Sequence, residues 1–230
     1  MLYITGDTHG ELIRFEHPVM KKLRKDDVLI ICGDFGFIWD GSLEEQKRLK
    51  QLEKRKYQIL FIDGKHENFD LLDRFQTEHF CGGVVHRIAE NVRHLMRGQI
   101  YEIESKKIFT FGGGESPDKE MRLSLGTWWP QEMPTIDEMK QGVKILDQAD
   151  RQVDYVITHE PPRHIKKLLC NHISTINPLE SFFDDLEKQV KFEKWFFGCM
   201  HIDRKITTKH YAVFSDIVAA EPTEKKRRWR

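Results

Sequence analysis

The sequence has few cysteines and no long apolar run. Its four cysteines, Cys32, Cys81, Cys170 and Cys199, are scattered, and no two of them form a C-x-x-C pair. This spacing argues against a disulfide framework and is typical of a reduced, intracellular protein. No apolar run approaches the roughly 20 residues that a membrane-spanning helix needs. The chain opens on a strand-like segment without a signal-peptide pattern, so we expect a cytoplasmic protein with no membrane partner.

The sequence also lacks an excess of either charge. It has 37 Lys and Arg residues against 37 Asp and Glu residues, so bulk charge gives no reason to expect a nucleic-acid partner. Internal repeats, Ser/Gly linkers and low-complexity segments are absent as well. A length of 230 residues suits one domain with a large core. We expect that domain to span residues 1–218, followed by a basic tail, 219–230, that is disordered.

What the sequence does contain is a series of apolar runs that predict strands. Strand and helix patterns alternate over the first 75 residues, which favours parallel βαβ units. Near the C-terminus, Lys205–Thr208 and Tyr211–Phe214 predict a hairpin about Lys209-His210. The expected class is therefore α/β with some antiparallel sheet. The predicted strands are Leu2–Thr5, Val28–Cys32, Ile59–Ile62, Ile108–Phe111, Val153–Thr158 and Trp195–Phe197.

Three segments carry helix signals. Ser42 and Glu45 have the spacing of a capping box, which predicts a helix as far as about Lys56. Thr135 with Glu138 can cap a second helix, and Asn177-Pro178 opens a third. The apolar positions of the last two helices recur at helical spacing and are expected to face the core: Ile136, Met139, Val143 and Leu146 in one, and Leu179, Phe182, Phe183, Leu186 and Val190 in the other.

Five of the predicted strands end in polar residues that can bind a metal. In open α/β sheets, ligands bind beyond the carboxyl ends of the strands, so these turns are expected to converge. Glycines beside the polar residues allow sharp turns and leave room for an ion or a phosphate. The five segments are G-D-T-H-G (6–10), G-D-F-G (33–36), D-G-K-H-E (63–67), T-H-E-P-P (158–162) and G-C-M-H (198–201).

Taken singly, each of these segments is a weak signal. Asp34 alone is typical of a turn or a helix cap, and His159 alone is typical of a core histidine. Asp7 and His9 form a stronger pair, because two ligands at this spacing can chelate one ion. Mixed imidazole and carboxylate ligation suits Mn, Fe or Zn better than Mg or Ca.

In this order the segments resemble the calcineurin-like metallophosphoesterase family, whose pattern runs D-x-H, G-D, G-N-H-[ED], H and G-H-x-H. Here the pattern stands as Asp7-Thr8-His9, Gly33-Asp34, Gly64-Lys65-His66-Glu67, His159 and Gly198-Cys199-Met200-His201. The resemblance covers residues 1 to about 218, and 112–150 looks like a smaller cytoplasmic bacterial branch. It implies a four-layer α/β/β/α sandwich with a two-metal site.

The resemblance carries the family's metal ligands over unevenly. The ligands of the first metal are all present, as Asp7, His9, Asp34 and His201. The second metal shares the G-D aspartate with the first. Its other three ligand positions hold Lys65, His159 and Cys199, of which Lys65 replaces an asparagine and Cys199 a histidine.

Lys65 and Cys199 therefore leave the second metal in question. A protonated lysine cannot bind a metal. Either its ammonium takes the place of the second metal, or the side chain turns to solvent and a second metal binds through fewer ligands. Cys199 either binds a soft ion as a thiolate or only pairs with Lys65. We expect one tightly bound divalent transition metal, Mn, Fe or Zn.

The resulting hypothesis is a metal-dependent phosphoesterase that hydrolyses a phosphomonoester or a phosphodiester. The resemblance implies that Asp34 bridges the metals and that His66 protonates the leaving oxygen. Lys65 would stabilise a phosphate oxygen. Gly112-Gly113-Gly114 suits either a phosphate approach or a plain tight turn. The alternative is a binding or regulatory protein on the same fold, catalytically weak or silent because of Lys65 and Cys199.

Overall fold

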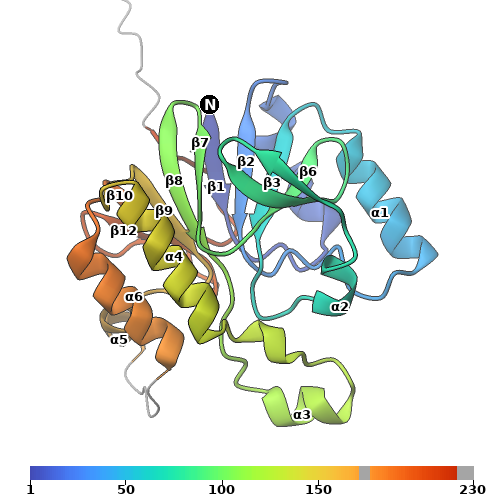
Figure 1. The fold of residues 1–230 in the computed structure, drawn as a ribbon. Coiled ribbons are helices and arrows are strands. Elements are labelled where there is room, and N and C mark those ends of the chain that lie inside the picture. Colours follow the sequence, from blue (N-terminus) through green and yellow to red (C-terminus); the bar gives the residue numbers. More distant parts are fainter. Residues whose placement is uncertain (171–176, 222–230) are drawn as a thin grey trace, which may run out of the picture.

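The computed structural model describes residues 1–170 and 177–221 of the chain. In these residues two β-sheets pack face to face, and helices cover the outer face of each sheet, as Figure 1 shows. The layers therefore run helix, sheet, sheet, helix. This arrangement confirms both the α/β class and the four-layer sandwich that the resemblance implies.

The first sheet has a parallel centre with antiparallel strands on both sides. Strands β1, β2, β3 and β6 pair in parallel, in that order. All three predicted strands of this parallel centre are present within one residue of their expected bounds. In sheet order the strands are β13 (Val218–Ala219), β1 (Leu2–Thr5), β2 (Val28–Cys32), β3 (Gln58–Ile62), β6 (Val92–Leu95), β5 (Gly83–Arg87) and β4 (Thr77–Phe80).

The second sheet also has four parallel strands at its centre. Strands β12, β10, β9 and β8 pair in parallel, and β7 and β11 add antiparallel edges. The parallel strands of the two sheets end on the same side of the molecule, since residues after β10 contact residues after β1. In sheet order the strands are β11 (Arg204–Lys205), β12 (His210–Ala212), β10 (Lys194–Phe197), β9 (Tyr155–Thr158), β8 (Lys106–Phe111) and β7 (Gln99–Ile103).

Strands β2 and β9, at the centres of the two sheets, are almost wholly apolar because both faces of each sheet are covered. Successive side chains of a strand point to opposite faces. In β2, Ile30 packs between the two sheets, whereas Leu29 and Ile31 pack on the outer side. In β9, Ile157 packs between the sheets and Val156 packs outward. Strands buried in this way read as continuous apolar runs, as these do.

The longer helices begin at the capping residues that the sequence indicates. Figure 1 shows α1 outside the first sheet, and α4 and α6 outside the second. Thr135 and Glu138 form the full capping box of α4, and the Asn177 side chain caps α6. The helices are α1 (Leu43–Glu53), α2 (Phe69–Leu72), α3 (Lys119–Ser124), α4 (Ile136–Gln148), α5 (Arg163–Leu169) and α6 (Pro178–Gln189), with short 3-10 helices η1 (Leu12–Glu16), η2 (Met20–Lys22) and η3 (Pro130–Glu132).

The start and the end of α1 differ from the prediction. Ser42 caps the helix, but the Glu45 carboxylate accepts hydrogen bonds from the amides of residues 39–41 and not from that of Ser42. The helix ends at Glu53, three residues before the expected Lys56. The cause lies in Asn91, whose side-chain amide donates to carbonyls at the end of α1 and in the turn into β3. A distant side chain thus sets this helix end.

Other predictions need small corrections. Ile136, expected in the core, is 71% exposed because it is the first residue of α4 and lies beyond the packed face. The C-terminal hairpin exists as β11 and β12, but its turn covers residues 206–209. The first sheet continues past the expected boundary at 218, since Ala219 pairs with Tyr3. Residues 222–230, the rest of the expected tail, lie outside the described residues.

Within the described residues, no helix combines the length and the apolar character that crossing a membrane requires.

Candidate metal centre

Five loops at the carboxyl ends of the parallel strands form one polar site. The loops follow β1, β2 and β3 of the first sheet and β9 and β10 of the second. The site therefore lies at the edge where the two sheets meet, as the sequence predicts. The predicted residues that these loops bring together are Asp7 and His9, Asp34, Lys65 and His66, His159, and Cys199 and His201.

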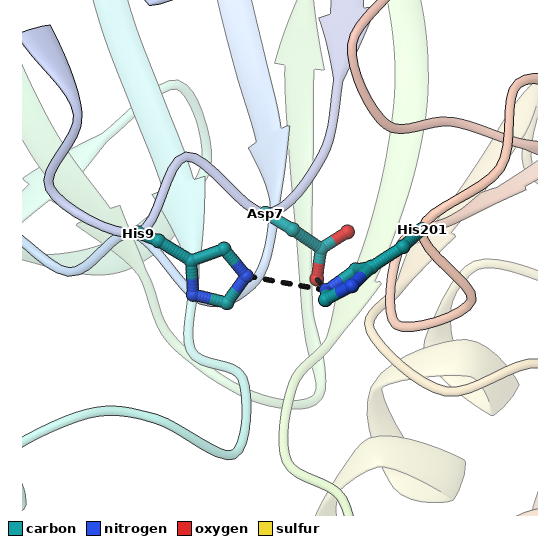
Figure 2. A group of neighbouring side chains, drawn as sticks. All are labelled: Asp7, His9 and His201. Atoms are coloured by element: carbon teal, nitrogen blue, oxygen red, sulfur yellow. Dashed lines mark hydrogen bonds and ion pairs between the residues drawn. The ribbon is translucent and has the colours of Figure 1, made fainter.

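The first part of the site is open to solvent. Asp7, His9 and His201 each offer a ligand atom, and these atoms all lie within 4.8 Å of one another. Figure 2 shows the two imidazoles in contact with each other beside the Asp7 carboxylate. Their Nε2 atoms are 3.2 Å apart, and the His201 side chain is 50% exposed. Two imidazoles and a buried carboxylate at this spacing suit a transition metal.

Asp34 lies at the centre of the site. It belongs to two further groups of possible ligands, one with His9 and His66 and one with Asp7 and His159. Its Oδ1 accepts hydrogen bonds from the amides of Lys65 and His66, at 2.7 and 2.9 Å. Burial alone would raise the pKa of Asp34, but His159 and His66 lower it well below its usual range. Asp34 is thus an ionised carboxylate that belongs to both of these groups of possible ligands.

His159 has a buried nitrogen, Nε2, that lies 3.5 Å from Asp34 Oδ1 but makes no hydrogen bond within the described residues. Its ring is fully buried, and Nδ1 lies 3.0 Å from the carbonyl oxygen of Cys32. A carbonyl can only accept, so Nδ1 carries the hydrogen, and in the neutral ring Nε2 presents a lone pair. Within residues 1–170 and 177–221, Nε2 finds no hydrogen-bond partner. An orphaned buried acceptor costs about 1–3 kcal/mol, so this nitrogen fits a bound cation.

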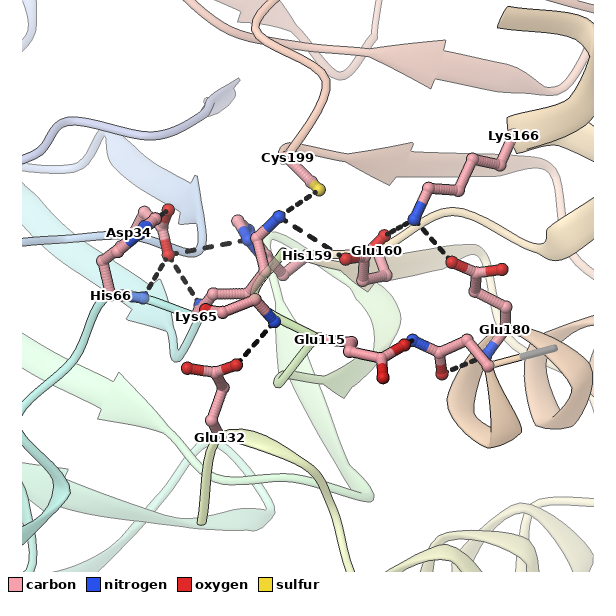
Figure 3. A network of polar contacts seen from close by, with 12 residues as sticks. Asp34, Lys65, His66, Glu115, Glu132, His159, Glu160, Lys166, Glu180 and Cys199 are labelled. Carbon is pink, nitrogen blue, oxygen red and sulfur yellow. Dashed lines mark hydrogen bonds and ion pairs between the residues drawn. The ribbon is translucent and has the colours of Figure 1, made fainter. Parts of the chain in front are cut away.

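Lys65 points into the protein and not into solvent. Its ammonium donates to the Cys199 sulfur at 3.1 Å and lies 3.6 Å from Glu160 Oε1 (Figure 3). The side chain is only 12% exposed. Burial opposes the charge of Lys65, but Cys199 and Glu160 raise its pKa overall. Of the two orientations that the sequence left open, the structure has the inward one.

Cys199 links the two parts of the site. Its amide donates to both carboxylate oxygens of Asp7, at 3.1 Å each. Burial raises the pKa of the Cys199 thiol, and Glu160 raises it further, although Lys65 opposes this. Lys65 and the Cys199 sulfur are therefore paired by a hydrogen bond, one of the two arrangements that the sequence allowed.

Five of the ten non-glycine residues with positive φ in the described part of the chain lie in these loops. Non-glycine residues rarely adopt positive φ, and such residues gather at functional sites because the conformation costs energy. The surrounding hydrogen bonds hold these turns in place and aim their side chains at one point. The positive φ angles are 44° at Asp7, 46° at His9, 47° at Asp34, 62° at Cys199 and 50° at His201.

Glycines in these loops make space for neighbouring side chains. A Cβ on Gly33 would lie 2.2 Å from His159 Nδ1, and one on Gly64 would lie 2.1 Å from Asp34 Oδ1. The room that the sequence assigned to an ion or a phosphate is therefore occupied by the predicted ligands themselves. In the same way, Gly112 lies against Asp63 and Gly114 against Lys65, so this glycine run lets the backbone pass close to these two side chains.

Sequence reasoning missed several residues that shape the site. Glu160 is fully buried beside Lys65, and its only signal was its place after His159. Glu67, which the family pattern includes but to which the sequence assigned no role, is also buried and accepts a hydrogen bond from the Phe35 amide at 2.8 Å, which fixes the turn that carries Asp34. Arg14 donates to the carbonyl oxygen of Asp7 at 3.1 Å. Nothing in a single sequence marks these contacts, because their partners are far away along the chain.

The fold and the site together define a class. An α/β/β/α sandwich with carboxylates and imidazoles at the strand ends is the architecture of metal-dependent hydrolases of the metallophosphoesterase type. The family model described as calcineurin-like phosphoesterase matches residues 2–203, and the chain belongs to this family.

Comparison with solved structures and curated proteins adds little to this assignment. One similar solved structure is a phosphopantetheinyl hydrolase from Mycobacterium tuberculosis, with 17% sequence identity, 93% of this chain and 89% of that chain covered, and a TM-score of 0.45. No curated protein gives a match to the chain.

Proposed function

We propose that this protein is a metal-dependent phosphoesterase that hydrolyses a phosphomonoester or a phosphodiester. The observation that carries this proposal is the convergence of Asp7, His9 and His201, whose ligand atoms lie within 4.8 Å of one another at the strand ends. Asp34 joins the set through His9. These four residues would hold one Mn, Fe or Zn ion, in keeping with their donor types.

A bound ion would supply a hydroxide nucleophile at neutral pH and stabilise charge on the phosphate oxygens. Our proposal gives the other tasks to residues beside the ion. Asp34 would keep its ionised carboxylate between the ligand groups, because two backbone amides and the His66 ring hold it in place. His159 would present Nε2, which lies 3.5 Å from Asp34 Oδ1, to the same region.

His66 is the proposed general acid. Its Nδ1 lies 2.7 Å from Asp34 Oδ2, which fixes the ring and leaves Nε2 for the substrate. The side chain is 36% exposed, so a substrate can reach it. Delivery of a proton to the leaving oxygen from this position would follow the usual pattern of a histidine oriented by a carboxylate.

Lys65 is the proposed second cation. Its ammonium, 3.1 Å from Cys199, would stand where the family places a second metal and would stabilise a phosphate oxygen there. One ion per chain is the expected metal content. A lysine supplies one positive charge where a divalent ion supplies two, so we expect turnover below that of a two-metal site.

The second candidate function is a binding or regulatory protein on the same fold. The observation that favours it is again the Lys65–Cys199 contact, because it occupies ligand positions of the second metal without providing a hard ligand. Such a protein would bind a phosphate group and release it unchanged.

One experiment separates the two candidates. Purified protein is loaded with Mn²⁺, its metal content is measured, and hydrolysis of an aryl phosphate is followed beside orthophosphate binding. Metal-dependent turnover that His9→Ala abolishes, and that His79→Ala on the exposed edge strand β4 retains, would support the enzyme. Tight phosphate binding without turnover would support the regulatory protein and refute the enzyme.

A further inference from the structure

Behind the Lys65–Cys199 pair lies a chain of alternating charges that the family pattern does not contain. Lys65 is 3.6 Å from Glu160, Glu160 is 2.9 Å from Lys166, and the Lys166 ammonium continues to Glu180 at 2.5 Å, as Figure 3 shows. We call Lys65, Glu160, Lys166 and Glu180 the charge ladder. The ladder runs from the site toward α5 and α6, away from the open ligands Asp7, His9 and His201.

Glu160 is the central member of the ladder. Its side chain is fully buried, so its charge must be neutralised within the protein. Oε2 accepts a hydrogen bond from Lys166 at 2.9 Å. Oε1 faces Lys65 and has no hydrogen-bond partner in the part of the chain that the structure describes. Glu160 Oε1 is therefore available to interact with the Lys65 ammonium.

The backbone leaves room for this contact at Gly114. A Cβ at this position would lie 2.7 Å from Lys65 Cγ and 3.0 Å from Glu160 Cγ. A methyl group there would press on both side chains at once. The last glycine of the run 112–114 thus lets Lys65 and Glu160 lie side by side.

We propose that Glu160 is the positioning residue that holds the Lys65 ammonium at the second-metal position. Glu160 does this with support from Lys166, which neutralises the other carboxylate oxygen and is itself held by Glu180. Without Glu160, Lys65 would be a flexible side chain with solvent within reach. The proposal rests on the proposed function for the role of Lys65 toward phosphate, but the placement of Lys65 can be tested without turnover.

The test is amine-acylation footprinting of the metal-free protein, with labelling rates read for each lysine by peptide mass spectrometry. In Glu160→Gln we expect labelling of Lys65 to rise about tenfold, the factor that corresponds to roughly 1.4 kcal/mol of lost protection. Glu180→Gln is the matched control, because it removes the same kind of buried charge and leaves Glu160 beside Lys65. It should raise labelling of Lys166 and leave Lys65 unchanged.

A purely structural role for Glu160 predicts a different result. General loosening would raise labelling of Lys65 and Lys166 alike, in both variants, and would overturn the proposal. Unchanged labelling of Lys65 in Glu160→Gln would overturn it too. If Glu160→Gln does not fold, Gly114→Ala takes its place, since the added methyl group displaces Lys65 from Glu160; slow labelling of Lys65 in that variant would refute the contact.

A second readout connects the placement to phosphate. On Mn²⁺-loaded protein, Lys65→Met and Glu160→Gln should each weaken orthophosphate binding about tenfold, and the double variant should be no weaker than either. Additive losses would refute a shared action. If labelling responds as expected but no aryl phosphate is hydrolysed, the positioning role stands and the proposed enzyme does not. If aryl phosphate is hydrolysed but Lys65 is labelled at the same rate in Glu160→Gln as in the parent, the proposed enzyme stands and the positioning role does not.

Discussion

The two parts of the site handle charge in different ways. On the open side, the ring of His201 is half exposed and contacts His9 beside the Asp7 carboxylate, and none of these three residues is a lysine or an arginine. On the closed side, Lys65 and Lys166 are each paired with buried carboxylates. In our proposal a metal ion supplies the positive charge on the open side, whereas Lys65 and Lys166 supply it on the closed side.

If Lys65 stands at a metal-ligand position, as we propose, this difference shows what a lysine at such a position requires. A buried ammonium is costly unless a carboxylate lies close to it, and the carboxylate then needs a second cation for its other oxygen. Glu160 and Lys166 meet these two needs in turn, and Glu180 completes the set. A substitution at one ligand position therefore involves residues as far away as α6.

The largest effect should follow from removing a ligand on the open side. Asp7→Asn keeps the shape of the side chain but takes away the charge that faces the two imidazoles, so we expect the tight ion and nearly all turnover to be lost. The loss of turnover should exceed the roughly 10²–10³-fold that removal of one hydrogen-bond donor typically causes. Metal analysis and aryl phosphate hydrolysis measure both. A variant that keeps its ion and its rate would show that the open side is not the metal site.

His66→Ala should damage chemistry and spare the metal. His66 is held by Asp34 but is not one of the proposed ligands, so kcat should fall roughly 10²–10⁴-fold while metal content persists. His79→Ala, which removes an exposed histidine from β4, serves as the control and should change neither quantity. Parallel loss of metal and rate would make His66 a ligand and remove it from the acid role.

Two substitutions on the closed side should allow it to bind a metal ion, as the open side is proposed to do. Lys65→Asn and Cys199→His together should allow a second ion to bind and raise the rate of aryl phosphate hydrolysis. The expected increase is roughly tenfold, the factor that corresponds to removing one unfavourable charge interaction. Each single change should give less, because both residues act on one position and their effects do not add. Lys65→Asn also removes one cation from Glu160, so adding Glu160→Gln should restore lost stability. Two ions in the unmodified protein would contradict this account.

The smallest effect is a loss of folding stability at acidic pH, and it should come from histidines that lie outside both sides of the site. Burial lowers the pKa of His86 to about 4 and that of His210 to about 4, and neighbouring His94 and His164, respectively, contribute. The unfolded chain therefore takes up these protons first as pH falls below about 6.5, and folding is destabilised down to pH 4.

The expected size of this acid effect is roughly 1–2 kcal/mol for each histidine by pH 5. Urea unfolding at pH 7.5, 6 and 5 measures it, and His86→Gln and His210→Gln should each flatten the dependence. Glu160 should not contribute in this range: burial opposes its charge, but Lys65 and Lys166 keep its pKa below the usual value. An unaltered pH dependence in both variants would place the acid sensitivity elsewhere.

The predicted strands were those with apolar side chains on both faces. The strands that the sequence did not reveal carry charged or imidazole side chains, such as β4 at the exposed edge of the first sheet. In β5 and β6, His86 and His94 are buried against each other with Nδ1 atoms 3.0 Å apart, and His94 reaches Asp63. Where buried polar residues bond to one another inside a sheet, the sequence shows no apolar pattern from which the strand could be predicted.

The sequence by itself determined which residues gather at the site. Each ligand candidate directly follows an apolar strand, and parallel strands place their carboxyl ends at one edge, so Asp7, Asp34 and His159 had to meet. Only the tertiary structure decided where Lys65 points. A long, flexible side chain follows its charge partners, and Glu160 becomes its partner only when the loop after β9 of the second sheet meets the loop after β3 of the first.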